Sequence, residues 1–347
     1  MMLEKTVDQI RELDSQAMEK ARSHQKNLIK PYGSLGMLED VAVKIAGMTG
    51  EVKPCLDNKA VITCAGDHGV ASLGVSVADQ DVTQQMVGGF LNGGAAINVI
   101  TRHTGARVVC VDMGMIKAVD DPRLLARRIG PGTNNIAQGP AMTREQARAA
   151  VEAGIEVATE EVRKGTQLLA TGDMGIGNTT PSTAILAAFT GFPVDLIVGK
   201  GTGIGDDALR RKERIVKDSL EVNKPDARDG LDVLAKVGGF EIGGIAGVIL
   251  GAAACRVPVV IDGFISGAGA MIARALAPRS VDYMLASHLS EEPGHRIMLT
   301  WIGARPMLNM NMRLGEGTGA ALTFTLIDAA MKIVREMATY DEAGVSD

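Results

Sequence analysis

The chain has 347 residues, a formal net charge of −5 and 46% hydrophobic residues. These values exclude wholesale disorder and allow one large domain with an appendage, and the mild acidity argues against binding nucleic acid through a basic stripe. Glycine is abundant, at 42 residues, and without any collagen-like period it belongs in specific turns and close backbone contacts.

The sequence predicts helices within residues 1–58, with a turn-rich loop at Lys30–Gly36 between them. Apolar residues recur at helical spacing before the loop and again after it. The first twenty residues carry charge and lack the apolar segment of a secretory signal. The four cysteines form no C-x-x-C pair, and three of them lie in or beside apolar runs as small buried residues. We therefore expect no disulfide framework and a reducing compartment. No stretch reaches the ~18 apolar residues of a membrane span. We therefore expect a cytoplasmic protein with no membrane span.

After residue 58, short apolar runs alternate with helix-length segments. The runs are Ala60–Ala65, Ala106–Val111, Gln167–Thr171, Val194–Val198, Val257–Ile261 and Val281–Ala286, with a weaker one at Leu308–Leu314. Runs this short and rich in Val and Ile are typical of parallel strands buried on both faces. The sequence predicts an α/β fold with a doubly wound, mainly parallel sheet over residues 59–305. Residues 1–58 and a C-terminal strand and helix at 306–347 are expected to form a smaller helical domain.

Polar and glycine-rich turns follow these runs, and the carboxyl ends of parallel strands share one edge, where ligands bind. Three of the turns have the form Gly-x-Gly-x-Gly or nearly so: Gly201–Gly205 and Gly315–Gly319 match it, and Gly175–Thr179 has Thr in place of the third glycine. Glycine lets backbone N–H groups approach a phosphate at a helix N-terminus. The dinucleotide fingerprint and the Walker A motif are both missing. We therefore expect a mononucleotide or sugar phosphate as the ligand.

The histidines do not predict a metal site, because neither H-E-x-x-H nor a pairing with cysteine is present. The segment Ser287–His295 could imitate a metal-binding loop, and this alternative stays open. The pair Asp67-His68 lacks the G-x-S-x-G turn of a nucleophilic hydrolase. We expect a protein that uses no metal and no cofactor.

Long strings of residues carry a family likeness over nearly the whole chain. They are Lys30–Gly36, Ala65–Val70, Gly94–Asn98, Gly132–Ile136, Gly175–Thr180, Gly238–Ile242, Asp262–Phe264, Gly315–Ala320 and Met337–Val345. In this order they resemble the nicotinate-nucleotide–dimethylbenzimidazole phosphoribosyltransferase family. The resemblance implies a Rossmann-like sheet and a homodimer. It also implies transfer of the 5-phosphoribosyl group from nicotinate mononucleotide to 5,6-dimethylbenzimidazole. The products are α-ribazole 5′-phosphate and nicotinate, in the assembly of the lower ligand of cobalamin.

The resemblance also implies roles for single residues. Glu316 is expected to accept the proton of the benzimidazole, and Ser76 and Gln84 are expected to bind the base. Asp173 stands where the family commonly has Glu, so we keep it as a second catalytic or ribose-binding acid. The other candidates for substrate binding are Gly175, Gly177, Asn178, Thr179, Lys200, Gly201, Thr202, Gly203, Lys212, Asp262 and Ser290.

Several alternatives stay open. Glu316 could instead cap the helix that starts near Thr318. Ala78 and Asp79 stand where the family often has Tyr-Pro, so the preferred acceptor base is not fixed. A non-enzymatic nucleotide-binding protein, or a phosphoribosyltransferase for another base, is the rival function. The apolar segment Glu241–Ala254 predicts a helix buried in a core or at a subunit interface, and we expect a homodimer.

Overall fold

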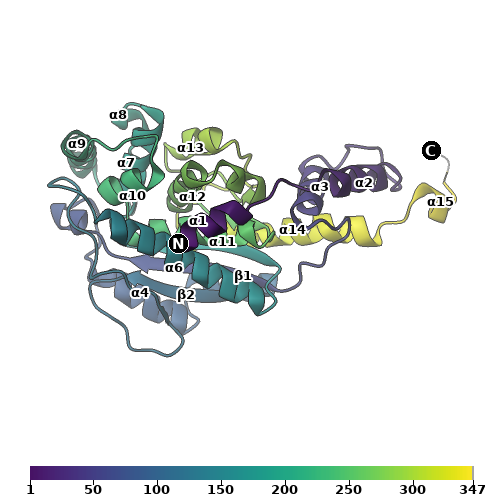
Figure 1. The fold of residues 1–347 in the computed structure, drawn as a ribbon, viewed down its shortest axis with the longest axis horizontal. Helices are drawn as coiled ribbons and strands as arrows, with labels where there is room; N and C mark the ends of the chain where they lie inside the picture. Colours follow the sequence, from purple (N-terminus) through teal and green to yellow (C-terminus); the bar gives the residue numbers. More distant parts are fainter. Residues whose placement is uncertain (346–347) are drawn as a thin grey trace.

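The computed structural model describes residues 1–345, and within them six strands form one parallel sheet (Figure 1). The strands are β1 (Lys59–Gly66), β2 (Ala106–Gly114), β3 (Leu125–Ala126), β4 (Leu168–Met174), β5 (Val259–Ile261) and β6 (Met284–Ala286). Their order is β3-β2-β1-β4-β5-β6, so the chain moves outward from β1 and then returns to place β4 on its other side. Ligands bind at the strand ends near such a reversal. The predicted α/β class with a Rossmann-like, mainly parallel sheet is confirmed.

The central strands are buried over almost their whole length. Every residue of β1 is buried, and its neighbour β4 is buried apart from Met174. Thr63 of β1 donates a hydrogen bond to the backbone carbonyl of Glu316, beside helix α14 (Thr318–Glu336), whereas Gly66 lies against Glu241 at the start of helix α11 (Phe240–Ala254). Helices therefore cover both faces of the sheet. A strand covered on both faces has a continuous apolar sequence, which is why the apolar runs predicted it.

Two groups of helices pack on the sheet. The first surrounds α11 (Phe240–Ala254) and contains α1 (Met2–Gln9), α6 (Arg144–Arg163), α10 (Gly230–Val237), α12 (Phe264–Leu276) and α13 (His295–Ile302), extended at one end by α7 (Thr179–Thr190), α8 (Val194–Ile197) and α9 (Asp206–Asn223). The second contains α4 (Asp81–Leu91), α5 (Ala96–Thr104) and α14 (Thr318–Glu336). The long helix α14 contacts β4, β5 and α5.

Helices from both terminal regions of the chain form a narrower lobe at one side of the molecule (Figure 1). Helices α2 (Ser15–Lys26) and α3 (Met37–Thr49) pack on each other, and α3 packs on α14. Leu28 pairs with Thr339 in an isolated bridge just before α15 (Tyr340–Ala343). Helix α1 lies instead against α6 and α11 of the sheet layers. The predicted domain boundaries at residues 58 and 305 stay a prediction. The last two residues of the predicted segment 306–347 lie outside the described part of the chain.

Two predicted strands are wrong. Residues 194–197 form the short helix α8, which begins directly after Pro193. A short apolar run fits a buried helical turn as well as a strand. Residues 308–314 make a single parallel bridge, between Leu308 and His288 just after β6. The rest of this segment is a loop, in which Asn311 has a φ of 54°. The two-residue strand β3 was too short to give any signal in the sequence.

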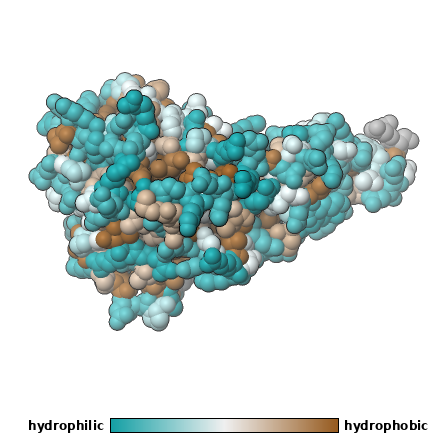
Figure 2. All heavy atoms as spheres, in the orientation of Figure 1, coloured by the Kyte–Doolittle hydropathy of each residue, from teal (hydrophilic) through white to brown (hydrophobic). Residues whose placement is uncertain are grey.

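The surface of the molecule is mixed in character. Hydrophilic side chains cover most of the face shown in Figure 2, and apolar residues lie between them in smaller groups. Among residues 1–345, no helix is both long enough and apolar enough to span a bilayer.

Helix α11 is buried within the chain itself, because α6, α12 and the sheet surround it. Its apolar surface therefore carries no argument for a subunit interface. The contact with α6 is glycine-based: a Cβ on Gly154 of α6 would overlap the carbonyl of Gly244, and one on Gly247 of α11 would overlap the carbonyl of Val151. Glycine at these positions lets the two backbones touch.

This contact predicts the effect of a single added methyl group. Gly247→Ala should lower the free energy of unfolding by ~1–3 kcal/mol, because overpacking forces rigid backbone apart. The measurement is urea unfolding followed by circular dichroism. Gly88→Ala in α4 is the matched control: a Cβ there meets nothing within 4 Å, so it should leave stability unchanged or raise it by ~0.5–1 kcal/mol. Equal midpoints for the two variants would contradict the close contact.

Candidate active site

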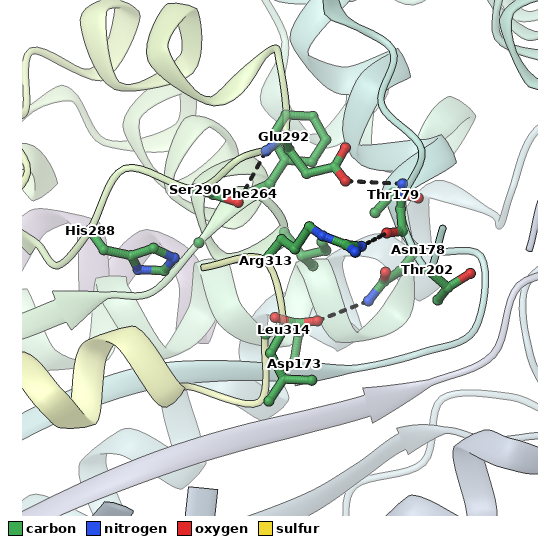
Figure 3. A pocket seen from close by; sticks show the side chains of 14 residues that line it. Asp173, Asn178, Thr179, Thr202, Phe264, His288, Ser290, Glu292, Arg313 and Leu314 are labelled. Carbon is green, nitrogen blue, oxygen red and sulfur yellow. Dashed lines mark hydrogen bonds between the residues drawn. The ribbon is translucent and has the colours of Figure 1, made fainter. Parts of the chain in front are cut away.

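An open cavity of about 500 Å³ lies at the carboxyl ends of β4, β5 and β6 (Figure 3). Its wall includes six of the predicted site residues: Asp173, Asn178, Thr179, Gly201, Thr202 and Ser290. They come from the turn after β4, the start of α7, the loop before α9 and the loop after β6. The structure therefore brings together residues that are more than a hundred positions apart in the chain.

Six further side chains that were not among the predicted substrate-binding residues line this cavity: Phe264, Ile265, His288, Glu292, Arg313 and Leu314. His288 and Phe264 follow the ends of β6 and β5 by two and three residues, so their place near a strand end was the available signal. Arg313 donates a hydrogen bond to the carbonyl of Gly201 at 3.0 Å, which joins the loop before α14 to the loop before α9 (Figure 3). It brings a guanidinium group, a good phosphate ligand, to the cavity.

The turn after β4 presents the N-terminus of α7 to the cavity. Gly175 packs over the carbonyl of Gly66, and Gly177 has a φ of 88°, a conformation that favours glycine. Asn178 and Thr179 follow and reach the cavity wall. The positive end of a helix dipole favours an anion at this position. Neither glycine lines the cavity itself, so both act by shaping the turn.

Lys212 supports the cavity from behind and is fully buried. Its Nζ donates to the hydroxyl of Thr179 at 2.7 Å and to the carbonyl of Gly199 at 2.9 Å. Burial lowers the pKa of Lys212 to about 8, and the nearby Glu292 carboxylate opposes that effect. The Lys212 ammonium therefore fixes the loop before α9 against the start of α7.

Glu292 holds the same loop from the other side. One carboxylate oxygen accepts the Gly201 N–H at 3.0 Å, and the other packs against Gly199 without a hydrogen bond. The N–H of Glu292 is in turn bonded to the Ser290 hydroxyl at 3.3 Å. The Gly201 N–H, which the sequence offered as a phosphate ligand, is therefore already occupied by a carboxylate.

Asp262 is buried at the end of β5 and does not line the cavity. Its two carboxylate oxygens accept the N–H groups of Gly317 at 3.1 Å and Ala320 at 3.0 Å, at the start of α14. The Nδ1 atom of His288 lies 3.8 Å away. Asp262 therefore caps α14 and sets the position of the Gly315–Gly317 turn that precedes it.

Glu316 lies in this turn, one residue beyond the cavity wall, and only 4% of it is exposed. It has a φ of 63°, which is uncommon for a residue other than glycine. Its Oε2 accepts the N–H of Ile97 at 3.1 Å, at the start of α5. Burial raises the pKa of Glu316, the Ile97 N–H lowers it in part, and Asp262 raises it further. The carboxylate thus bonds α5 and does not cap α14.

The remaining predicted residues surround the cavity without lining it. The Ser76 hydroxyl lies 3.1 Å from that of Thr202, whereas Gln84 is half-buried in α4. Lys200 is exposed and pairs with Asp206 at 2.8 Å. Gly203 has a φ of 104° in the same loop and meets open space. No group of three or more potential metal ligands occurs within residues 1–345.

Known proteins resemble this chain over almost its whole length. A family model described as "Phosphoribosyltransferase" matches residues 10–345, and together with the parallel sheet this match defines the chain as a phosphoribosyltransferase. Nicotinate-nucleotide–dimethylbenzimidazole phosphoribosyltransferase of Desulforamulus reducens is 54% identical, with 99% of each chain covered. The Geobacter sulfurreducens protein of that name is 53% identical, over 100% of this chain and 99% of its own.

A crystal structure of the same kind of enzyme, from Thermus thermophilus, superposes with a TM-score of 0.92 at 46% identity. It covers 96% of this chain and 100% of its own. This chain belongs to the nicotinate-nucleotide–dimethylbenzimidazole phosphoribosyltransferase family.

The geometry at Asp262 gives a second prediction. Asp262→Ala should lower the free energy of unfolding by ~1–3 kcal/mol, because two buried N–H groups of α14 lose their acceptor. Urea unfolding measures this loss. Asp229→Ala is a matched control, since Asp229 caps α10 at a more exposed site, and it should cost less. An unchanged midpoint for Asp262→Ala would show that this carboxylate does not hold α14.

Proposed function

We propose that this protein transfers the 5-phosphoribosyl group of nicotinate mononucleotide to 5,6-dimethylbenzimidazole. The products are α-ribazole 5′-phosphate and nicotinate, for the lower ligand of cobalamin. The observation that carries the proposal is a buried carboxylate, Glu316, held next to an anion-binding cavity in a chain that matches such transferases over its full length.

The cavity offers the phosphoribosyl group a polar cradle. Thr179 and Asn178 at the start of α7 supply a helix N-terminus, and Arg313 supplies a guanidinium group. Ser290 and Thr202 add hydroxyl groups at the wall. We place the phosphate at this end, so that the ribose extends toward Asp173 and Gly315. The bond to be broken then lies near the turn that carries Glu316.

The chemistry needs a base more than an acid. Nicotinate bound through its ring nitrogen is a pyridinium, so it leaves as a neutral ring without a proton. One benzimidazole nitrogen attacks the anomeric carbon, and the other nitrogen must then lose its proton. Glu316 accepts that proton: Oε2 is held by Ile97, which leaves Oε1 for the base. Burial raises the pKa of Glu316 toward neutral pH. A general base is most effective when its pKa lies near the working pH.

Ser76 and Gln84 are proposed to contact the acceptor base. Ser76 lies beside Thr202 of the cavity wall, and Gln84 lies in α4. The acceptor is therefore expected to enter between α4 and the loop before α9. Asp173, Gly175, Gly177, Lys200, Gly203, Lys212 and Asp262 keep supporting roles in this proposal, in the turns and loops described above.

The direct test is a transfer assay. The purified protein is incubated with nicotinate mononucleotide and 5,6-dimethylbenzimidazole, and chromatography follows nicotinate and α-ribazole 5′-phosphate. Equal amounts of both products, formed only when both substrates are present, are expected. Nicotinate release that does not depend on the acceptor would identify a hydrolase, and no release at all would favour a binding protein without activity.

Glu316→Gln should lower kcat by about 10²–10⁴-fold, because it keeps the shape and removes the base. Nicotinate mononucleotide should still bind. In the native protein kcat should fall as the pH drops through the raised pKa of Glu316, since only the ionised form accepts a proton, and the variant should lack this fall. Glu336→Gln, exposed at the far end of α14, is the control and should keep full activity.

A variant with most of its kcat but a lower unfolding midpoint would make Glu316 a purely structural contact to α5. The search for the base would then move to Asp173, the other acid near the reacting end of the cavity.

The homodimer and the cytoplasmic location also belong to this proposal. Both are supported by the family likeness, and the dimer gains nothing from α11, which is covered within the chain. Light scattering at micromolar concentration should give the mass of two chains, about twice 36.3 kDa. A measured mass of one chain would contradict the proposed homodimer.

A further inference from the structure

Three buried carboxyl groups converge where the cavity meets the start of α14. They belong to Asp173 at the end of β4, Asp262 at the end of β5 and Glu316 before α14. Asp173 is only 6% exposed and lines the cavity. Its Oδ2 accepts the Asn178 side-chain N–H at 3.0 Å, and its Oδ1 has no hydrogen-bond partner (Figure 3). An unpaired oxygen of a buried carboxylate is costly, so the group needs a proton or a ligand.

The three groups are not equally able to carry charge. Burial raises the pKa of Asp262, but His288 and the backbone N–H groups of Ala320 and Gly317 at a helix N-terminus lower it in part and favour its ionised form. Glu316 has one such bond, from Ile97. Asp173 has only a neutral side-chain amide. Burial raises the pKa of Asp173 well above its ordinary value, and the charge of Asp262 raises it further.

The other acids around Asp173 act in the same sense, and the guanidinium of Arg313 is the opposing charge in the cavity wall. Glu241 at the start of α11 adds negative charge and further raises the pKa of Asp173. Its partner is His68, at 2.7 Å. His288 stands beside Asp262. Arg313 lines the same cavity, but its hydrogen bond goes to the carbonyl of Gly201. The end of the cavity near Asp173 is therefore prepared for a cation.

We propose that Asp173 carries a proton in the free protein and releases it to solvent when the pyridinium ring of nicotinate mononucleotide enters the cavity. This inference rests on the proposed function, which supplies the cation. A positive charge within a few ångströms favours the ionised carboxylate. The ionised Asp173 then faces the positive charge that stays at the anomeric centre while the bond to nicotinate breaks.

The proton count closes over the cycle. Binding of the pyridinium nucleotide releases one proton from Asp173. Bond breaking leaves nicotinate with a neutral ring, and the new bond puts the positive charge on the benzimidazole ring. Glu316 removes the N–H proton of that ring, so the product base is neutral and Asp173 takes a proton back from solvent. The proton on Glu316 leaves to solvent, which gives one proton released per transfer.

Calorimetry in two buffers of different ionisation enthalpy, at the same pH, counts the protons released on binding. Nicotinate mononucleotide is titrated alone, and ribose 5-phosphate is the reference because it has the phosphate without the pyridinium. The native protein should release close to one proton more with the nucleotide than with ribose 5-phosphate. Asp173→Asn should lose this difference. Glu336→Gln, which changes an exposed carboxylate at the far end of α14, should keep it.

A second measurement needs no variant. If a proton leaves on binding, the affinity for the nucleotide relative to ribose 5-phosphate should rise by about tenfold per pH unit while Asp173 is protonated in the free protein. A flat ratio from about pH 6 to about pH 8 would overturn the proposal. So would a proton difference that survives in Asp173→Asn, or a nucleotide that does not bind. If the transfer assay succeeds while the proton difference is absent, the proposed function stands and this inference alone fails.

Discussion

The capping of α14 by Asp262 is the interaction on which the site depends. The carboxylate joins the end of β5 to the N-terminus of the helix through two hydrogen bonds, and all of these atoms are buried. The turn before the helix must then cross directly over β4, where a Cβ on Gly172 would overlap the backbone of Glu316. Glu316 takes a left-handed conformation in this turn and reaches α5. One strand end thus places the carboxylate that is proposed to carry the reaction.

The cavity combines two kinds of charge. The N-terminus of α7 and Arg313 line it, and so does Asp173, whose carboxylate accepts a hydrogen bond from Asn178 at 3.0 Å, while Glu316 lies just behind the wall. A mononucleotide that carries both a phosphate and a pyridinium presents the complementary pair of charges. Lys212 and Glu292 lie outside this pattern because they bond the loop before α9. Their charges shape the wall before any ligand arrives.

Much of this arrangement could be predicted from the sequence, and the failures have physical causes. The buried strands gave continuous apolar runs, and the residues after β4 formed a recognisable glycine turn. Residues 194–197 misled because an apolar run of that length fits a helical turn equally well. Asp262 was expected to bind substrate, whereas it caps α14, because a side chain's partner depends on which element packs above it. Glu292 and Arg313 were missed for the same reason: each acts on a loop about a hundred residues away.

Helix α14 has a consequence for distant parts of the chain. Its 19 residues span about 28 Å at a rise of ~1.5 Å per residue, and it runs from the turn that carries Glu316 to the narrower lobe that contains α2 and α3. A stiff rod held at both ends transmits a tilt at one end to the other. The packing of α3 on α14 is then part of the alignment of Glu316. We expect a substitution in the narrower lobe that tilts α14 to shift the Glu316 carboxylate at the other end of the helix, and so to change the turnover number without contacting a substrate.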